Sequence, residues 1–174
     1  MSNPTQTLFP SLEYLGGATR YVEDILEIVD RLPLFEDLRL PEIESLCSFM
    51  HCFGAPRNAE LLTEGRDGDF LLIVLTGSVK VTKHCEGGDK LVALVGPGAT
   101  LGEMSMIDGA PRFASCITVE PTDFAVLTRS DLNEILVNMP RLGNKFLLVL
   151  LQLMTRRLRQ ASESLLPHLN SASV

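Results

Sequence analysis

The stretch from residue 55 to residue 129 most constrains the fold, because short apolar runs alternate there with turn residues. The runs are rich in Val, Ile, Leu and Thr, and Gly, Pro, Asp and Ser separate them. Segments of this length and spacing predict antiparallel strands that close into a sandwich or barrel. Phe70–Leu75 is apolar without interruption, which predicts a strand buried on both faces. Gly77 then predicts a positive φ or a close backbone approach.

The residues before this segment predict helices. Residues 1–18 mix Pro, Ser, Thr, Gln and Gly, which indicates a loosely ordered leader. Residues 19–54 form a predicted N-terminal helical segment. Its first helix, from 21 to 31, places Val and Ile side chains on one face and acidic ones largely elsewhere. Its second helix has Pro41 in the first turn and reaches Met50.

The residues after it, 130–174, also predict helices. Ser130 or Asp131 would cap a short helix, and Pro140 would begin a long one. Within the long helix, apolar residues recur at alternating steps of four and three, which is typical of a coiled-coil seam. The stretch 140–165 is therefore a predicted dimerisation helix, although the same face would also suit packing on its own domain. The seam residues are Leu147, Leu151, Met154, Leu158, Ala161 and Leu165.

Composition excludes several classes of protein. The chain has 174 residues, enough for one domain with a single core. The net charge of −7 argues against sequence-independent binding to nucleic acid. The longest apolar runs, Phe70–Leu75 and Phe146–Leu151, have six residues each, too few to span a membrane. The first residues resemble no secretory signal, so a cytoplasmic location is expected.

The four cysteines show no Cys-x-x-Cys spacing; they are Cys47, Cys52, Cys85 and Cys116. Cys47, His51 and Cys52 would share a helix face and so offer three metal ligands, but no fourth ligand is evident. We therefore predict reduced, structural cysteines and no metal. No nucleophile–base constellation is apparent either, and the three histidines lie far apart in the sequence. The chain is not expected to be an enzyme.

The stretch from 101 to 115 holds the candidate binding residues. Arg112 offers a planar fork of donors to a phosphate, and the free N–H groups of a short helical turn also point at an anion. Glu103 cannot favour a phosphate, but its carboxylate can accept hydrogen bonds from a sugar hydroxyl. The pair therefore suits a sugar phosphate, with Arg112 expected half in water at a pocket wall. Alternatively, the two side chains form an ion pair in a surface turn.

This stretch resembles the phosphate-binding cassette of cyclic nucleotide-binding domains, as in bacterial catabolite activator proteins and protein kinase A regulatory subunits. The shared pattern is Gly-Glu, a short apolar helix, then Pro-Arg and small residues. The acidic, glycine-containing turn at 64–69 before an apolar strand and Gly77 also resembles the family, as do Leu-Pro-Leu-Phe at 32–35 and Met-Thr-Arg-Arg-Leu at 154–158. The resemblance covers residues 32–160.

The resemblance implies an antiparallel β-roll, a jelly-roll-like double-stranded β-helix, with N-terminal helices and a long C-terminal helix. It gives Glu103 the ribose 2′-hydroxyl and Arg112 the cyclic phosphate, with backbone N–H groups near Ser105, Phe113 and Ala114. It also places Ala161 and Ser162 where the catabolite activator uses Thr-Ser to read adenine. The implied ligand-binding residues are Gly102, Glu103, Met104, Ser105, Arg112, Phe113, Ala114 and Ser162.

Two residues depart from the family pattern. Phe113 stands where the family usually has a small or hydroxylated residue, and a hydroxyl there accompanies a preference for guanine. Cyclic AMP is therefore favoured over cyclic GMP, and the ring would either stack on a base or crowd the pocket. Ala161 can offer no side-chain hydrogen bond to adenine.

These expectations combine into a regulatory sensor module that binds a cyclic nucleotide. Only fourteen residues follow Gln160, too few for a recognition helix, so no contact with nucleic acid or membrane is expected of this chain alone. Its signal would pass through the geometry of a homodimer or through a separate effector protein. The alternative is a dimeric interaction scaffold with the same fold and a pocket that binds nothing.

Overall fold

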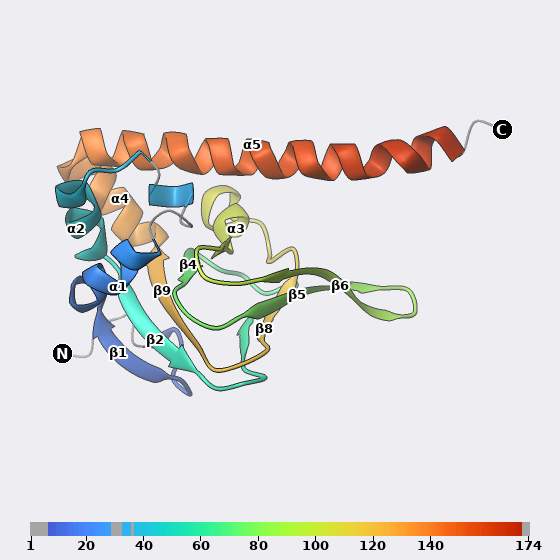
Figure 1. Ribbon diagram of the computed structural model, residues 1–174, viewed down its shortest axis with the longest axis horizontal. Coiled ribbons are helices and arrows are strands. Elements are labelled where there is room, and N and C mark those ends of the chain that lie inside the picture. Colours follow the sequence, from blue (N-terminus) through green and yellow to red (C-terminus); the bar gives the residue numbers. More distant parts are fainter. Residues whose placement is uncertain (1–6, 29–32, 36, 172–174) are drawn as a thin grey trace.

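The structure is a computed structural model that describes residues 7–28, 33–35 and 37–171. Within these residues nine strands form two antiparallel sheets (Figure 1). One sheet has the order β1-β2-β9-β4-β7, and the other has the order β3-β8-β5-β6. The predicted β-roll is confirmed. The strands are β1 (Glu13–Gly17), β2 (His51–Ala55), β3 (Glu60–Leu62), β4 (Phe70–Val74), β5 (Val79–Cys85), β6 (Gly88–Val95), β7 (Thr100–Leu101), β8 (Ser115–Thr118) and β9 (Thr122–Thr128).

Strand β4 is buried on both faces, as its uninterrupted apolar sequence predicts. Because successive side chains point to opposite faces of a sheet, Leu71 and Ile73 pack against the helices. Leu72 and Val74 instead enter the interior of the roll. The roll interior also holds Phe53, whose ring stacks on that of a phenylalanine in β9 with centroids 5.8 Å apart. One sheet therefore supports two apolar cores, one inside the roll and one under the helices.

The N-terminal region differs from its predicted organisation. Residues 13–17, expected in a loosely ordered leader, form β1, which pairs with β2. Strand β2 in turn begins at His51, inside the predicted helical segment, because Cys52 and Phe53 alternate between the two cores. Residues 1–6 of the predicted leader lie outside the described residues. The glycines and polar residues of β1 gave no alternation of apolar and polar residues that would predict a strand. Its burial depends instead on pairing with β2.

The N-terminal helices cover the first sheet beside β1 and β2 (Figure 1). The first predicted helix appears over a shorter range, and its predicted residues 29–31 lie outside the described part of the chain. The second carries Pro41 in its first turn, as expected, but ends at Cys47 because β2 follows closely. The elements are the 3₁₀ turn η2 (Ala18–Tyr21), α1 (Val22–Glu27), the 3₁₀ turn η4 (Pro33–Phe35) and α2 (Leu40–Cys47).

Two helices follow the roll, α4 (Arg129–Asn138) and α5 (Pro140–Ser171). The cap of α4 is Thr128, rather than the predicted Ser130 or Asp131. The Thr128 hydroxyl accepts a hydrogen bond from the Asp131 N–H at 3.1 Å, and the Asp131 carboxylate accepts one from the Thr128 N–H. The prediction misplaced the helix cap by two or three residues and so missed this reciprocal capping box. Pro140 begins α5 as predicted.

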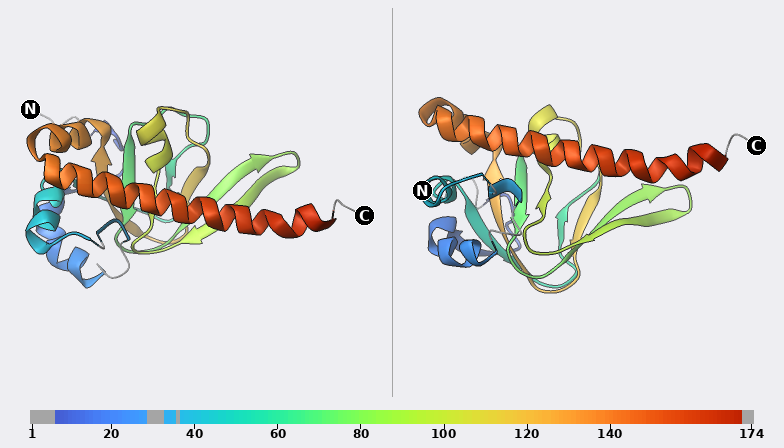
Figure 2. Two further views of the ribbon diagram at one scale, coloured as in Figure 1. Left: turned by 90° about the horizontal axis from the view of Figure 1, so that it is seen from above. Right: turned by 45° about the horizontal axis from the view of Figure 1, so that its top comes forward.

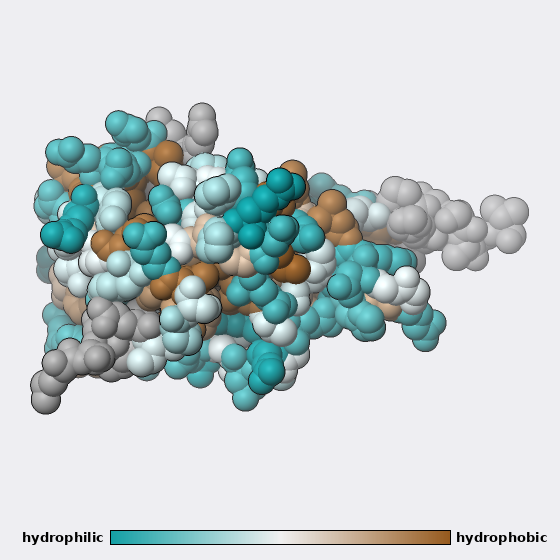
Figure 3. Space-filling model, turned by 90° about the horizontal axis from the view of Figure 1, so that it is seen from below, coloured by the Kyte–Doolittle hydropathy of each residue, from teal (hydrophilic) through white to brown (hydrophobic). Residues whose placement is uncertain are grey.

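Helix α5 crosses the body of the molecule and extends beyond it, in the same direction as the β5–β6 hairpin (Figure 2). Gly77 before this hairpin has a φ of 75°, and a methyl group there would collide with the carbonyl oxygen of Pro121. The expectation for Gly77 is therefore confirmed. Seen from below, apolar patches lie among hydrophilic residues, some of them towards the end where hairpin and helix project (Figure 3).

Within the described residues no helix has the length and apolar composition needed to cross a membrane. Cys47 lies at the end of α2 and His51 and Cys52 in β2, so the three do not share one helix face as the metal alternative required. The described residues contain no group of three or more His, Cys, Asp or Glu side chains that could hold a metal.

Candidate binding site

The short helix α3 (Glu103–Asp108) forms the centre of the site. Glycines flank it on both sides in the left-handed conformation, Gly102 with a φ of 81° and Gly109 with a φ of 73°. Glycine adopts this conformation without the steric cost that a side chain brings, so the sequence can turn sharply into and out of a single helical stretch. The first turn of α3 faces a cavity, while Ile107, farther along the helix, is exposed and does not line it.

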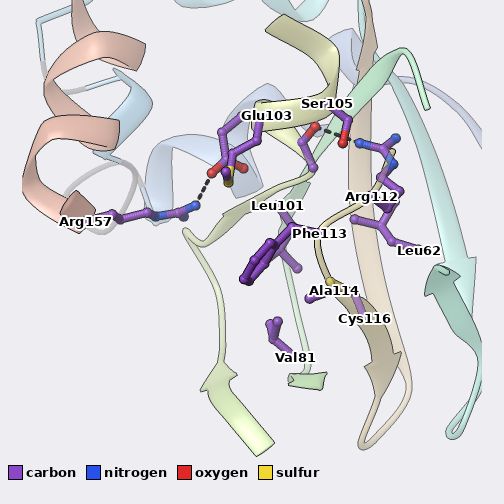
Figure 4. A pocket seen from close by; sticks show the side chains of 12 residues that line it. Leu62, Val81, Leu101, Glu103, Ser105, Arg112, Phe113, Ala114, Cys116 and Arg157 are labelled. Atoms are coloured by element: carbon purple, nitrogen blue, oxygen red, sulfur yellow. Dashed lines mark hydrogen bonds and ion pairs between the residues drawn. The ribbon is translucent and has the colours of Figure 1, made fainter. Parts of the chain in front are cut away.

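A cavity of about 130 Å³ lies beside α3 (Figure 4). It brings together seven of the eight predicted ligand-binding residues, those of the stretch from 102 to 114. The eighth, Ser162, does not line it: Ser162 is exposed on α5, and its hydroxyl donates a hydrogen bond to the Leu158 carbonyl oxygen at 2.8 Å. The lining residues are Leu62, Val81, Leu101, Gly102, Glu103, Met104, Ser105, Arg112, Phe113, Ala114, Cys116 and Arg157.

Arg112 is buried, with 4% of its surface exposed. Its Nη1 donates to the Gly102 carbonyl oxygen at 2.7 Å and its Nη2 to that of Phe70 at 2.9 Å. The guanidinium carbon lies 4.5 Å from the centroid of the Phe70 ring. The expectation that Arg112 stands half in water is wrong. A methyl group on Gly68 would collide with the guanidinium, so the glycine leaves the space that Arg112 fills.

The buried groups at this cavity have shifted pKa values. Burial lowers the pKa of the Arg112 guanidinium, although nearby anionic groups, including Asp69 and Glu103, oppose the shift. Burial raises the pKa of the Cys116 thiol to about 12, with a further contribution from Glu103. The thiol therefore stays neutral at ordinary pH and adds no charge to the cavity.

Glu103 is also buried, and its partner is Arg157 rather than Arg112. Nη1 of Arg157 pairs with Oε1 of Glu103, and Nη2 donates to the Thr100 carbonyl oxygen at 2.6 Å. Arg157 lies on α5, so this contact connects the cassette to the long helix (Figure 4). The alternative of a Glu103–Arg112 ion pair in a surface turn is wrong, because Arg112 binds carbonyl oxygens and Glu103 binds α5.

A second, apolar groove lies between α3 and α5, with a volume of about 450 Å³. It shares Glu103, Met104 and Arg157 with the cassette cavity. Ala161, which the resemblance placed near the adenine, lines this groove and not the cavity. The Glu103–Arg157 pair therefore stands where the two hollows meet.

Comparison with known proteins identifies the family of the chain. The profile of the cyclic nucleotide-binding domain matches residues 55–138. A crystal structure of a cyclic nucleotide-binding domain from Methylobacillus flagellatus KT is 53% identical, with a TM-score of 0.84, and the match covers 94% of this chain and 92% of that one. The chain belongs to the cyclic nucleotide-binding domain family.

Curated relatives include a cyclic AMP receptor protein and a transcriptional regulator. The cyclic AMP receptor protein of Thermus thermophilus is 32% identical over 130 residues, which cover 74% of this chain and 58% of the relative. A CRP-like cAMP-activated global transcriptional regulator of Mycobacterium tuberculosis is 28% identical, with 80% of this chain and 61% of the relative covered. The chain therefore spans about three fifths of the length of these relatives.

Within this cyclic nucleotide-binding domain, the sequence did not reveal every residue at the site. Arg157 lies within the Met-Thr-Arg-Arg-Leu motif and Gly68 within the acidic glycine turn, so a signal existed for both. The motif did not say that Arg157 would meet Glu103, 54 residues earlier. Lys83 and Arg129, which contact the cassette from β5 and from the start of α4, carried no recognisable signal.

Proposed function

We propose that this chain binds a cyclic nucleotide in the cassette cavity and acts as a regulatory module. The observation that carries the proposal is that Glu103 and Arg112 line one cavity beside the first turn of α3. A guanidinium has five N–H donors, and its bonds to Gly102 and Phe70 use two of them. Donors therefore remain for a phosphate oxygen, in a setting where burial strengthens the attraction.

The ribose is assigned to Glu103. Arg157 occupies Oε1 of this carboxylate, and a carboxylate has about four lone-pair sites. A ribose hydroxyl can therefore donate to Oε2 while the pair with α5 persists. Backbone N–H groups near Ser105, Phe113 and Ala114 complete the phosphate contacts in this proposal, since the first N–H groups of a helix have no partner within the helix.

Cyclic AMP is the favoured ligand. Phe113 supplies no hydroxyl to a guanine, and Ala161 supplies no hydrogen bond to any base. The names of the Thermus and Mycobacterium relatives, which specify cyclic AMP, support the same choice.

The response to the ligand would pass through α5. Arg157 joins this helix to the carboxylate that binds the ribose, so a change at Glu103 alters the contacts of α5. The ligand can shift α5 between two placements by no more than its difference in affinity for them. The output is then a change in homodimer geometry or contact with a separate effector protein, and the module has no catalytic role.

The interaction scaffold remains the second candidate, because the cavity is small. Its volume of about 130 Å³ lies below the roughly 300–1,000 Å³ typical of ligand pockets. In this reading Phe113 crowds the cavity, and the dimer forms without any nucleotide.

Thermal unfolding with candidate ligands distinguishes the two functions. Cyclic AMP, cyclic GMP and cyclic di-GMP are each added at millimolar concentration, and the unfolding midpoint is measured. A ligand at about 100 times its Kd stabilises the folded state by about 2.7 kcal/mol, so cyclic AMP is expected to raise the midpoint by several degrees. An unchanged midpoint with all three, in a protein that is still dimeric, would favour the scaffold.

A further inference from the structure

Phe113 is the most exposed side chain at the cavity, with 57% of its surface accessible, although its neighbours Arg112 and Ala114 are buried. An exposed aromatic ring on a loop normally samples several rotamers. This ring instead has a fixed partner: Nζ of Lys83 lies 4.5 Å from its centroid. A cation at this distance over a ring face is attracted by the ring quadrupole.

Lys83 is itself held in place by two hydrogen bonds. Its Nζ donates to Oε1 of Glu64 and to the carbonyl oxygen of Phe113, both at 2.7 Å. Oε2 of Glu64 accepts the backbone N–H of His84 at 2.8 Å. The hydrogen bond from the His84 N–H lowers the pKa of Glu64 most, and the one from Lys83 lowers it further. The carboxylate therefore keeps its charge in mildly acidic solution. Three segments distant in sequence therefore fix the position of one ring.

The Phe113 ring also reaches the cavity. Phe113 and Val81 line the cavity, whereas Lys83 does not. The exposed ring is therefore available to a base in the cavity while Lys83 stays close to it.

We propose that Phe113 is the platform on which the base of the ligand stacks, and that Lys83 is the positioning residue that holds this platform ready. The inference rests on the proposed function. The strength of stacking on an aromatic ring depends on the area of overlap with the base and not on the hydrogen-bonding pattern of the base. The site therefore prefers purines to pyrimidines, while the ring itself contributes little to the choice between adenine and guanine.

Affinities for cyclic AMP and cyclic CMP, measured by titration calorimetry, test the proposal. The two ligands share the ribose and cyclic phosphate and differ in the area of the base. In the wild type we expect cyclic AMP to bind more tightly. Phe113→Ala is expected to weaken cyclic AMP binding by roughly 5- to 150-fold, the range of a lost base–aromatic stack, and to bring the ratio of the two affinities close to one. Phe113→Trp keeps a stacking face and should keep the ratio.

Lys83→Met should lower the same ratio while Phe113 is still present, and Lys83→Arg, which keeps a cation able to lie over the ring, should restore it. Lys80→Met, on the same strand, is the matched control and should behave as wild type. Tighter binding by Phe113→Ala would overturn the platform, because a crowding ring would have been relieved. A ratio that falls in Phe113→Ala but not in Lys83→Met would overturn the role of Lys83. Wild-type protein that binds neither nucleotide would overturn the proposed function, and this assignment with it.

Discussion

The Arg112 guanidinium is a buried cation whose hydrogen-bond partners are two backbone carbonyl oxygens. These carbonyls belong to Gly102, at the start of the cassette, and to Phe70, at the start of β4. The arginine therefore joins the cassette to the roll in addition to offering donors to a phosphate. A charge in this position is costly unless it is paired, so a substitution of Arg112 is expected to affect folding as well as binding.

Arg112→Ala is expected to destabilise the protein by roughly 1–3 kcal/mol, since it leaves buried carbonyl oxygens without a donor. The same change should abolish nucleotide binding. Chemical denaturation measures the first effect and titration calorimetry the second. Arg112→Lys keeps the charge but not the planar fork, so it should retain part of the stability and little of the binding. An alanine variant as stable as wild type would show that the two carbonyl bonds contribute nothing.

Gly68→Ala supplies a control in which Arg112 is intact. The added methyl group would collide with the guanidinium, so the arginine has to move and binding should weaken. Gly96→Ala is the matched glycine, because the nearest atom to its methyl group would be 3.8 Å away. Full affinity in the Gly68 variant would mean that the position of the guanidinium is not critical.

The sequence could predict the site only where its residues are contiguous. Residues 102–105 and 112–114 reach the same cavity because a short helix flanked by two glycines keeps them together. Arg157 and Ser162 lie on a long helix whose direction and rotation depend on packing with the roll, and the sequence does not encode these locally. The resemblance therefore predicted Ser162 at the site, whereas in the structure Arg157, and not Ser162, lines the cavity.

At the scale of elements, the cassette helix is fastened at its far end by Arg129. Nε of Arg129 donates to the Met106 carbonyl oxygen and Nη2 to that of Ser105, both at 2.6 Å. Carbonyl groups in the last turn of a helix have no partner within it, and a cation there also suits the helix dipole. Arg129 is the first residue of α4, so the cassette and α4 are tied together.

Arg129→Ala is expected to loosen α3, because it removes two charge-assisted hydrogen bonds, each worth roughly 1.5–3 kcal/mol. Hydrogen exchange measures this directly as faster exchange of the α3 amides in the absence of ligand. Arg141→Ala, on the exposed first turn of α5, is the control and should leave this exchange unchanged. Equal protection of α3 in both variants would contradict the tie between cassette and α4.

Elements with their own periodicity were predictable and those formed by pairing were not. Strand β4 and helix α5 carry their patterns within their own sequences, and both appear where expected. Strand β1 is recognisable only through its partner β2, and Thr128 caps α4 only because β9 ends there. Such features arise from tertiary context, which overrides local propensity.

At the scale of the whole molecule, α5 has two apolar faces with different surroundings. Phe146, Val149 and Leu150 are buried against the helical core. Leu151, Leu158 and Leu165 remain 62%, 67% and 59% exposed. These three are spaced by seven residues, the heptad repeat of a coiled-coil seam. Only part of the predicted seam is therefore exposed, because Leu147 packs against the chain's own core. We expect the exposed part to contact a second copy of the chain.

We expect the chain to be a homodimer through this exposed face, and Leu151→Asp with Leu158→Asp to convert it into monomers. The two leucines would face their counterparts across the seam, where carboxylates would be desolvated without partners. Because both positions are exposed in the single chain, the substitutions should leave the fold intact, which circular dichroism can verify. Leu91→Asp, on the exposed hairpin strand β6, is the control for an added charge outside α5 and should stay dimeric. Sedimentation velocity measures the outcome: a double variant that sediments as the wild-type dimer would place the interface elsewhere, and a wild type that is already monomeric would exclude α5 as a dimer seam.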